Sequence, residues 1–330
     1  MDKSLLSTAA RVVVLLCIAG AITSLFSTTN LPIILLIAAL FGAFSPVRRA
    51  WVSARGTALR PAIIWSVVAI SLSILAQFAA LQEPVESGRP LSGQITYLST
   101  VAVFATLTSV LNARTPGGGA WAILMVMLMV VFLVPWLEGS GLVREGNGWD
   151  RLRLNPPWTI FYGLLVIAGV TNYVPTRFGQ SAFVLALGFV LQYLVLTQLQ
   201  WTHQVRGQLG TCVGICWAAS IWLADVAFIE KKIPAPGLPR LWWWFRNSWG
   251  VVWALRVQER FNRTAEAASW PIRLNWHGVI SANPSANLQP LAIPPEAEAT
   301  LAGLLRRFAT AGRLSEAGGS QENIDLSAGS

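Results

Sequence analysis

The sequence has few charged residues. They make up 12% of the 330 positions, whereas they make up about a quarter of a typical soluble domain. Hydrophobic residues account for 54%, and the mean hydropathy is +0.55. This composition excludes a water-soluble globular protein, because so few charges cannot cover the surface of a chain of this length.

Residues that bind metals or perform catalysis are also scarce. The chain has two histidines, His203 and His277, and three cysteines, Cys17, Cys212 and Cys216. Every cysteine lies in an apolar stretch, where free cysteine is usually a buried packing residue. The sequence contains no Walker phosphate loop, no zinc-protease helix and no nucleophile elbow. We therefore predict no metal and no other cofactor, and an enzyme is disfavoured.

Long apolar stretches, in contrast, are abundant. A helix rises about 1.5 Å per residue, so crossing the hydrocarbon layer takes about 17 to 25 residues. The stretches are Leu5 to Phe26, Leu31 to Phe44, Pro61 to Leu81, Ile95 to Leu111, Ala120 to Leu137, Trp158 to Val174, Ser181 to Leu199 and Leu209 to Ile229. Most approach the required length, although the second is short. They predict an all-α polytopic integral membrane protein with about eight transmembrane helices over residues 1–230.

The first apolar stretch has a second interpretation. Lys3 and Arg11 precede the apolar run from Val12 to Ile18, and Ala19-Gly20-Ala21 fits the small-residue pattern of a signal-peptide cleavage site. Cleavage would remove residues 1–21 and leave seven spans with an external N-terminus.

Basic residues are distributed unevenly between the two sides of the predicted bundle. If the N-terminus is cytoplasmic, the cytoplasmic segments collect Lys3, Arg11, Arg48, Arg49, Arg55, Arg60, Arg114, Arg177, Lys231, Lys232, Arg240 and Arg246. Cytoplasmic loops of membrane proteins are enriched in Lys and Arg. We therefore expect both termini in the cytoplasm and the protein in a bacterial-type inner membrane. The same distribution explains the net charge of +9 without nucleic acid as a partner.

Polar side chains inside the predicted spans are candidate functional groups, because they are costly in hydrocarbon. Asp225 lies about one turn from the cytoplasmic end of the last span. It could bind a proton or cation, but an ion pair with an arginine such as Arg177 or Arg114 is favoured so close to the interface. Asn112 and Asn172 could line a polar cavity, although helix capping and interhelical hydrogen bonds are commoner uses.

The tail, residues 231–314, begins with a proline-rich linker. Over residues 241–268 aromatic and apolar side chains recur at steps of three and four, which predicts an amphipathic helix with arginines on its other side. Such a helix suits the headgroup region, where indoles are half solvated and guanidinium groups meet phosphates. The residues predicted to contact anionic lipid headgroups or a partner are Trp242, Phe245, Trp249, Trp253, Arg256, Arg260, Phe261 and Arg263. The alternative is a helix packed on the cytoplasmic loops or on a partner protein.

The rest of the tail has three predicted segments. Apolar residues alternate with polar ones over residues 272–280, which predicts a half-buried strand that must pair within the tail or with another chain. A helix is predicted over residues 295–313, opened by Pro294-Pro295 and with acidic residues first and basic residues last. Residues 315–330 are small, polar and acidic, and we expect disorder there.

These features favour a non-catalytic scaffold, assembly or interaction subunit that acts through its cytoplasmic tail. The concentrated, patterned residues lie in the tail, while the predicted spans are nearly devoid of polar groups. The alternative is a small transporter for an apolar or lipid-like substrate, with a midplane cavity bordered by Asn112, Asn172, Gln192 or Asp225. A membrane enzyme would need at least two acids or histidines in one pocket.

Overall fold

The computed structural model describes residues 3–26, 30–82, 91–111, 123, 126–127, 130–134, 136, 156–197, 206–230, 234–282 and 293–319. The chain divides into two compact units. The bundle unit comprises Met1–Ser53, Leu59–Asn112 and Gly119–Lys231, and the tail unit comprises Ala54–Ala58, Ala113–Gly118 and Lys232–Ser330. The connector Ala54–Ala58 therefore belongs with the tail, although it lies between two helices of the bundle.

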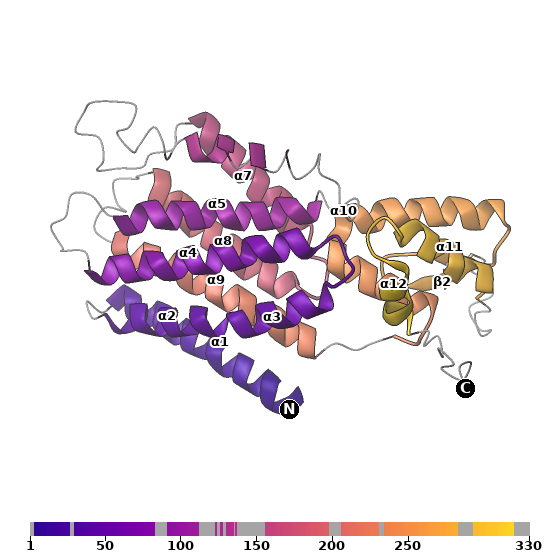
Figure 1. Ribbon diagram of the computed structural model, residues 1–330, viewed down its shortest axis with the longest axis horizontal. Coiled ribbons are helices and arrows are strands. Elements are labelled where there is room, and N and C mark those ends of the chain that lie inside the picture. Colours follow the sequence, from indigo (N-terminus) through magenta and orange to yellow (C-terminus); the bar gives the residue numbers. More distant parts are fainter. Residues whose placement is uncertain are drawn as a thin grey trace, which may run out of the picture. The chain divides into compact units, whose positions relative to one another are not determined.

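The bundle unit is helical (Figure 1). Its helices are α1 (Lys3–Phe26), α2 (Leu31–Gly42), α3 (Phe44–Ser53), α4 (Arg60–Gln82), α5 (Leu91–Leu111), α7 (Pro156–Thr171), α8 (Gly179–Thr197) and α9 (Arg206–Ile229). Six segments are long and apolar enough to cross a membrane: Leu5–Ser24, Leu31–Ser53, Arg60–Gln82, Leu91–Leu111, Gly179–Leu196 and Gln208–Ile229. Helix α7 is apolar but shorter, and the predicted span from Ala120 to Leu137 lies largely outside the described residues.

The second span is longer than its apolar stretch indicated. Ala43 keeps right-handed helical geometry between α2 and α3, and its N–H donates to the carbonyl oxygens of Ala39 and Leu40 at 3.1 Å. The two helices therefore form one 23-residue candidate span, Leu31–Ser53, instead of ending at Phe44. Gly42 and Ala43 do not break the helix here, because the backbone hydrogen bonds continue through them.

Apolar residues occupy both the interior and the exterior of the bundle. Inside, Phe104 of α5 stacks on Phe189 of α8 with ring centroids 4.9 Å apart, and Tyr162 of α7 meets Phe104 edge-on at the same distance. Outside, Ile160 of α7 and Phe183 of α8 are exposed. Helices that are apolar all round are typical of a membrane environment.

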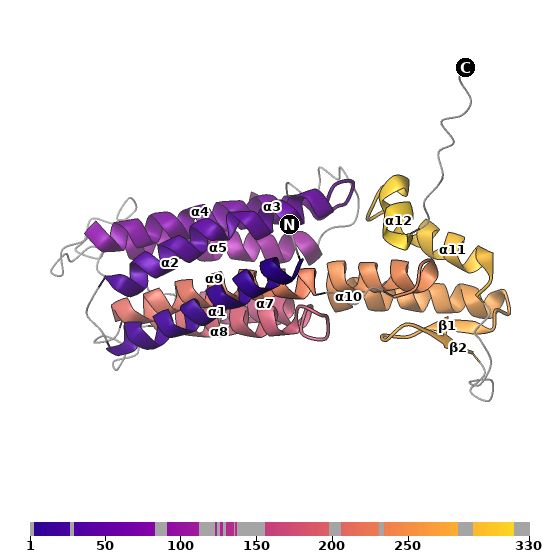
Figure 2. The same ribbon diagram turned by 90° about the horizontal axis from the view of Figure 1, so that it is seen from below.

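Neighbouring bundle helices pack through small and hydroxyl residues as well as large ones. Helix α4 lies along α5, and α1 and α8 both lie along α9 (Figures 1 and 2). Between α4 and α5, the hydroxyls of Ser73 and Ser99 are 2.6 Å apart, and Ser99 also donates to the carbonyl of Ala69 at 2.9 Å. Interhelical hydrogen bonds of this kind hold membrane helices together where burial of apolar surface gives little driving force.

The tail unit is built around α10 (Leu238–Ala267). The sequence predicts one uninterrupted helix over 241–268, but the structure differs at Gly250, whose φ of 76° and ψ of −169° are not helical. This backbone region is accessible almost only to glycine. The glycine therefore divides α10 into two helical segments, and both segments contribute to the core of the unit.

A β-hairpin follows α10, where the sequence predicts a single strand over 272–280. Strand β1 (Ile272–Leu274) pairs antiparallel with β2 (Val279–Ser281), so the pairing partner lies within the tail. The amide side chain of Asn262 joins α10 to this hairpin. It donates to the carbonyl of Leu274 at 2.8 Å and accepts from the Leu274 N–H at 2.7 Å.

Two helices, α11 (Pro295–Leu305) and α12 (Ala311–Gly318), replace the single helix predicted over 295–313. Figure 2 shows them on one side of α10 and the hairpin on the other. Between α11 and α12 the backbone pairs with the connector: Ala58 N–H donates to Phe308 at 2.9 Å, and Thr310 N–H donates to Gly56 at 2.8 Å. Helix α12 extends into the segment predicted to be disordered, and residues 320–330 lie outside the described residues.

Candidate functional site

Asp225 of α9 forms an ion pair with Arg49 of α3. The carboxylate is 2% exposed, and Arg49 Nε donates to Oδ1 at 3.0 Å while Nη2 donates to Oδ2. The position of Asp225 near the end of its span predicts an ion pair, but the partner is Arg49 and not Arg177 or Arg114, the arginines that the sequence suggests. A two-point contact of this geometry satisfies a buried carboxylate. Arg114 lies outside the described residues.

Arg177 lies between α7 and α8 and is held against aromatic rings. Its guanidinium carbon is 4.5 Å from the ring centroid of Phe178 and 5.4 Å from that of Phe228 in α9. Burial lowers the pKa of Arg177 to about 10, so the side chain is still positively charged at neutral pH. The ring contacts provide an attraction that partly replaces water.

Glu230, which follows α9, is held by α1. Arg11 Nη2 donates to Glu230 Oε1 at 2.6 Å, and the Ser7 hydroxyl donates to the same oxygen. The hydrogen bonds from Ser7 and Arg11 hold the pKa of Glu230 below its usual value. At the other end of α1, the Ser24 hydroxyl lies 3.2 Å from the sulfur of Cys212. Side-chain contacts therefore join α1 to α9 and the residue after it, Glu230, near both ends of α1.

The remaining polar positions predicted in the membrane have different outcomes. Asn172, directly after α7, is buried, and Gln192 of α8 is also buried. Asn112 lies outside the described residues. Among the described residues, no group of three or more His, Cys, Asp or Glu side chains could hold a metal ion.

The structure places the aromatic members of the predicted contact helix inside the tail unit. Their side chains are buried: Trp242, Phe245, Trp249, Trp253 and Phe261. Phe308, which follows α11, covers three of them, with ring centroids 4.9 Å from Phe245, 5.7 Å from Trp249 and 5.2 Å from Trp253. The spacing correctly indicates an apolar face, but this face is covered by protein. Of the predicted contact residues, only the arginines Arg256, Arg260 and Arg263 lie on the surface.

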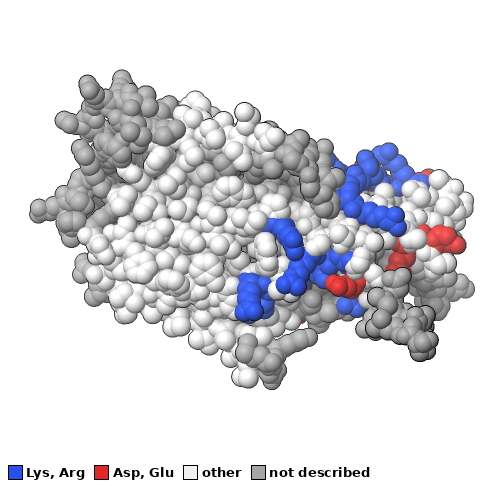
Figure 3. Space-filling model, viewed as in Figure 1, with Lys and Arg blue, Asp and Glu red and all other residues white. Residues whose placement is uncertain are grey.

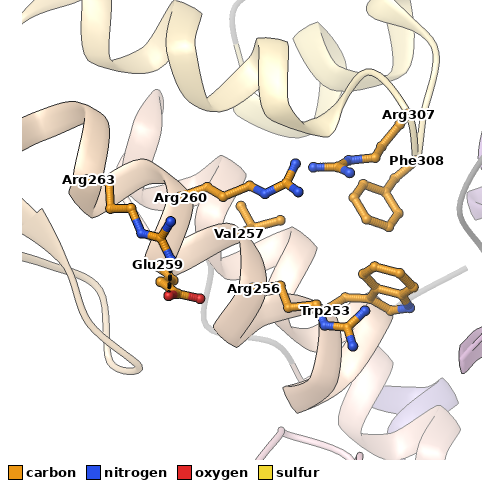
Figure 4. Close-up of a pocket in the computed structure, with 8 residues that line it drawn as sticks. All are labelled: Trp253, Arg256, Val257, Glu259, Arg260, Arg263, Arg307 and Phe308. Atoms are coloured by element: carbon orange, nitrogen blue, oxygen red, sulfur yellow. Dashed lines mark hydrogen bonds and ion pairs between the residues drawn. The ribbon is translucent and has the colours of Figure 1, made fainter.

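Those arginines line a pocket on the tail unit. Its volume is about 390 Å³, and its lining is drawn in Figure 4. The lining residues are Trp253, Arg256, Val257, Glu259, Arg260, Arg263, Arg307 and Phe308. We call it the arginine pocket. Arg307 was not among the predicted site residues, because basic residues at the end of the predicted 295–313 helix were interpreted as complementing the helix dipole.

The arginine pocket has a strong excess of positive charge. Four of its lining side chains are guanidinium groups, and Glu259, the one carboxylate among them, is paired with Arg263. Arg256 lies 5.2 Å from the ring centroid of Trp253, and Arg307 lies 5.5 Å from that of Phe308. Figure 3 shows Lys and Arg side chains gathered over the tail unit and at one end of the bundle unit, whereas much of the visible bundle surface is uncharged.

Trp253 and Phe308 provide the ring faces on which Arg256 and Arg307 lie. A guanidinium over an indole or phenyl ring is attracted to the ring face, and its N–H groups point outward in its own plane. The arrangement can bind an anion through several charge-assisted hydrogen bonds at once. Comparison of the chain with known protein families, curated proteins and solved structures finds no match in any of the three.

Proposed function

We propose that this protein is a non-catalytic membrane scaffold or assembly subunit of a bacterial-type inner membrane. Its bundle unit anchors the chain in the bilayer, and its tail unit binds a protein partner on the cytoplasmic side. The observation that carries the proposal is the tail unit itself, which combines a buried aromatic core with exposed residues on its surface. A folded unit of this kind offers a defined surface to a partner without ordering a flexible segment on binding.

The ionisable groups at the cytoplasmic end of α9 support a structural role for the bundle. The carboxylate of Asp225 is paired with Arg49, and Glu230 is paired with Arg11. Each acid is therefore engaged by a basic side chain of another helix. Such pairs fix the packing of α1 and α3 on α9, which is what an anchoring bundle requires.

Backbone pairing supports a common side for the connector Ala54–Ala58 and the tail. Gly56 and Ala58 hydrogen-bond to residues that lie beyond α11, so both segments have to reach the same side of the bilayer. The connector carries Arg55 and is flanked by Arg48 and Arg49 on one side and Arg60 on the other. Segments rich in arginine stay in the cytoplasm, which favours a cytoplasmic tail.

The orientation is tested by labelling introduced cysteines in intact cells with a membrane-impermeant maleimide. Trp149 lies in the sequence between the apolar stretches Ala120 to Leu137 and Trp158 to Val174, a loop that the predicted topology places outside. We expect Trp149→Cys to be labelled in intact cells, and Arg273→Cys, on β1, only after permeabilisation. For this experiment the three natural cysteines, Cys17, Cys212 and Cys216, are replaced by alanine so that only the introduced cysteine reacts. Labelling of Arg273→Cys in intact cells would place the tail outside and contradict the proposal.

The scaffold function is tested by photo-cross-linking in cells that express the full-length protein. A photoreactive residue is placed at Leu255 or Ile280, which are 50% and 43% exposed on the tail unit, and at Ile160, which is 65% exposed on α7. We expect a protein adduct of defined mass from at least one tail position and a different adduct pattern from Ile160. If neither tail position yields a protein adduct that Ile160 lacks, the tail unit does not recruit a partner.

A further inference from the structure

The arginine pocket brings four positive charges close together on the tail unit. Arg256, Arg260 and Arg263 follow one another on α10 at steps of four and three residues, so they lie on one side of the helix. Like charges at these steps repel one another and destabilise a helix. Glu259 offsets this repulsion at Arg263, and an anion bound between Arg256 and Arg260 would offset it there.

A fourth arginine reaches the same pocket from another part of the chain. Figure 4 shows the guanidinium groups of Arg260 and Arg307 directed toward one another across the pocket. Arg307 follows α11, so its approach to α10 depends on the tertiary packing of the tail unit. Arg307 Nε donates to the carbonyl of Leu304 at 3.4 Å. An anion that binds both Arg260 and Arg307 would reduce the repulsion between the two like charges.

The protein supplies little negative charge to this pocket. Glu259 pairs with Arg263 at the edge of the row, and it is the one carboxylate among the lining residues. Val257 and Phe308 form a buried apolar floor beneath the arginines. An apolar floor strengthens the attraction between the guanidinium groups and a bound anion, because it excludes water from one side.

We propose that the arginine pocket binds a phosphate group. A phosphate carries up to two negative charges and has several acceptor oxygens, so it can accept paired hydrogen bonds from more than one guanidinium. A single carboxylate has two acceptor oxygens and one charge, fewer than a phosphate offers to guanidinium groups that come from two separate elements. The volume of about 390 Å³ lies within the range of about 300 to 1,000 Å³ that small-ligand sites occupy.

The phosphate can belong to a lipid headgroup or to a soluble phosphate compound, and Leu255 distinguishes the two sources. Leu255 precedes Arg256 on α10, and its side chain is 50% exposed. Val252, one turn earlier on the same side of the helix, is also exposed. An acyl chain can contact this apolar pair while the phosphate binds the arginines, whereas a soluble phosphate has no group that needs it.

The test measures binding of inorganic pyrophosphate to the full-length protein in maltoside micelles by isothermal titration calorimetry. We expect Arg260→Gln to weaken binding by about tenfold or more, because it removes charge-assisted hydrogen bonds to the phosphate. Arg260→Lys should also weaken binding, because an ammonium cannot replace a two-point contact. The control is Arg273→Gln, an exposed arginine of the same unit outside the pocket, which should leave the affinity unchanged.

The source is decided by repeating the titration with monomeric dihexanoyl phosphatidic acid. Leu255→Ser weakens binding of this lipid but not of pyrophosphate if the natural ligand is a headgroup, and weakens neither if the ligand is soluble. The proposal is overturned if neither probe binds, if Arg260→Gln weakens binding no more than Arg273→Gln, or if a hexaglutamate peptide binds more tightly than both phosphates. Unchanged hydrogen exchange in α10 checks that each variant is folded. None of these results depends on the protein partner sought by cross-linking.

Discussion

The replacement of Gly250 by alanine is the most direct test of how the tail unit folds. Gly250 is buried, and its φ of 76° and ψ of −169° place it in a region that residues with a side chain rarely occupy. Alanine there must either keep this backbone at a cost of about 1 to 3 kcal/mol or straighten α10. A straight helix would separate the aromatic groups that lie on either side of the glycine.

Those groups share a single covering ring. Phe245 precedes Gly250 and Trp253 follows it, yet both contact Phe308, at 4.9 Å and 5.2 Å between ring centroids. A continuous helix would change their relative directions, so straightening α10 would disturb the contacts with Phe308. We therefore expect the Gly250→Ala variant to keep the bend in α10 with a strained backbone, and to have a lower free energy of unfolding.

The chain provides a matched control in Gly303. It lies on the exposed side of α11, has no positive φ, and an added methyl group would meet nothing within 4 Å. Gly303→Ala should stabilise the helix by about 0.5 to 1 kcal/mol, because alanine is the better helix former. The same chemical change is thus expected to have opposite signs at two glycines of one unit.

Hydrogen exchange measured by mass spectrometry on the full-length protein in micelles gives the assay. Amides of the second segment of α10, after Gly250, report the free energy of opening of the tail unit. Gly250→Ala should reduce their protection by a factor of about 5 to 150, the equivalent of about 1 to 3 kcal/mol. If protection is unchanged in Gly250→Ala, or falls as much in Gly303→Ala, the backbone conformation at Gly250 does not hold the unit together.

Three further predictions concern the contacts that join separate elements. Arg49→Gln leaves the buried Asp225 carboxylate without its ion pair and should destabilise the solubilised protein by about 3 to 5 kcal/mol; Tm measurements should show a smaller loss in the double variant with Asp225→Asn. Hydrogen bonds from Ser7 and Arg11 lower the pKa of Glu230 in the folded protein. The stability that they give to the folded protein is therefore complete at neutral pH and is lost as the pH falls through this lowered pKa. On acidification, Tm should fall less in Glu230→Gln than in the wild type. Phe308→Ala should lower the free energy of opening measured by hydrogen exchange in α10 by about 3 to 5 kcal/mol, whereas replacement of the exposed Ile280 by alanine should have no effect. Equal effects would contradict the role given to Phe308.

The helical membrane character and the apolar face of α10 follow from the sequence, because both are periodic or continuous patterns of side-chain polarity. The pattern at Trp242, Trp249 and Phe261 does not say what covers the face. Lipid, partner and protein core all favour the same spacing. Phe308, which covers Phe245, comes from beyond α11, and its approach depends on tertiary packing that a local pattern does not record.

Other features depend on pairs of residues far apart in the sequence. Arg49 and Asp225 are separated by 176 positions, and several arginines near the ends of the predicted spans are equally plausible partners by composition alone. Arg307 enters the arginine pocket because α11 ends where it does and the chain then pairs with the connector. Gly250 is a different case: glycine also occurs inside regular helices, so its presence alone does not predict a bend.

The pairing of Ala54–Ala58 with the tail also constrains the number of spans, independently of which side is the cytoplasm. Segments on one side of a bilayer are separated by an even number of crossings. Between the connector and the tail lie α4, α5, α8 and α9, each long enough to span, together with α7 and the apolar run from Ala120 to Leu137. If all four of these helices cross, the number is already even, and an even total then requires that α7 and this run both cross or both do not. The exposed Ile160 on α7 favours contact with lipid, and crossing of both would expose Trp149 on the side opposite the tail. Labelling of Trp149→Cys therefore reports on both segments at once, because a single crossing would be incompatible with the backbone hydrogen bonds between the connector and the residues after α11.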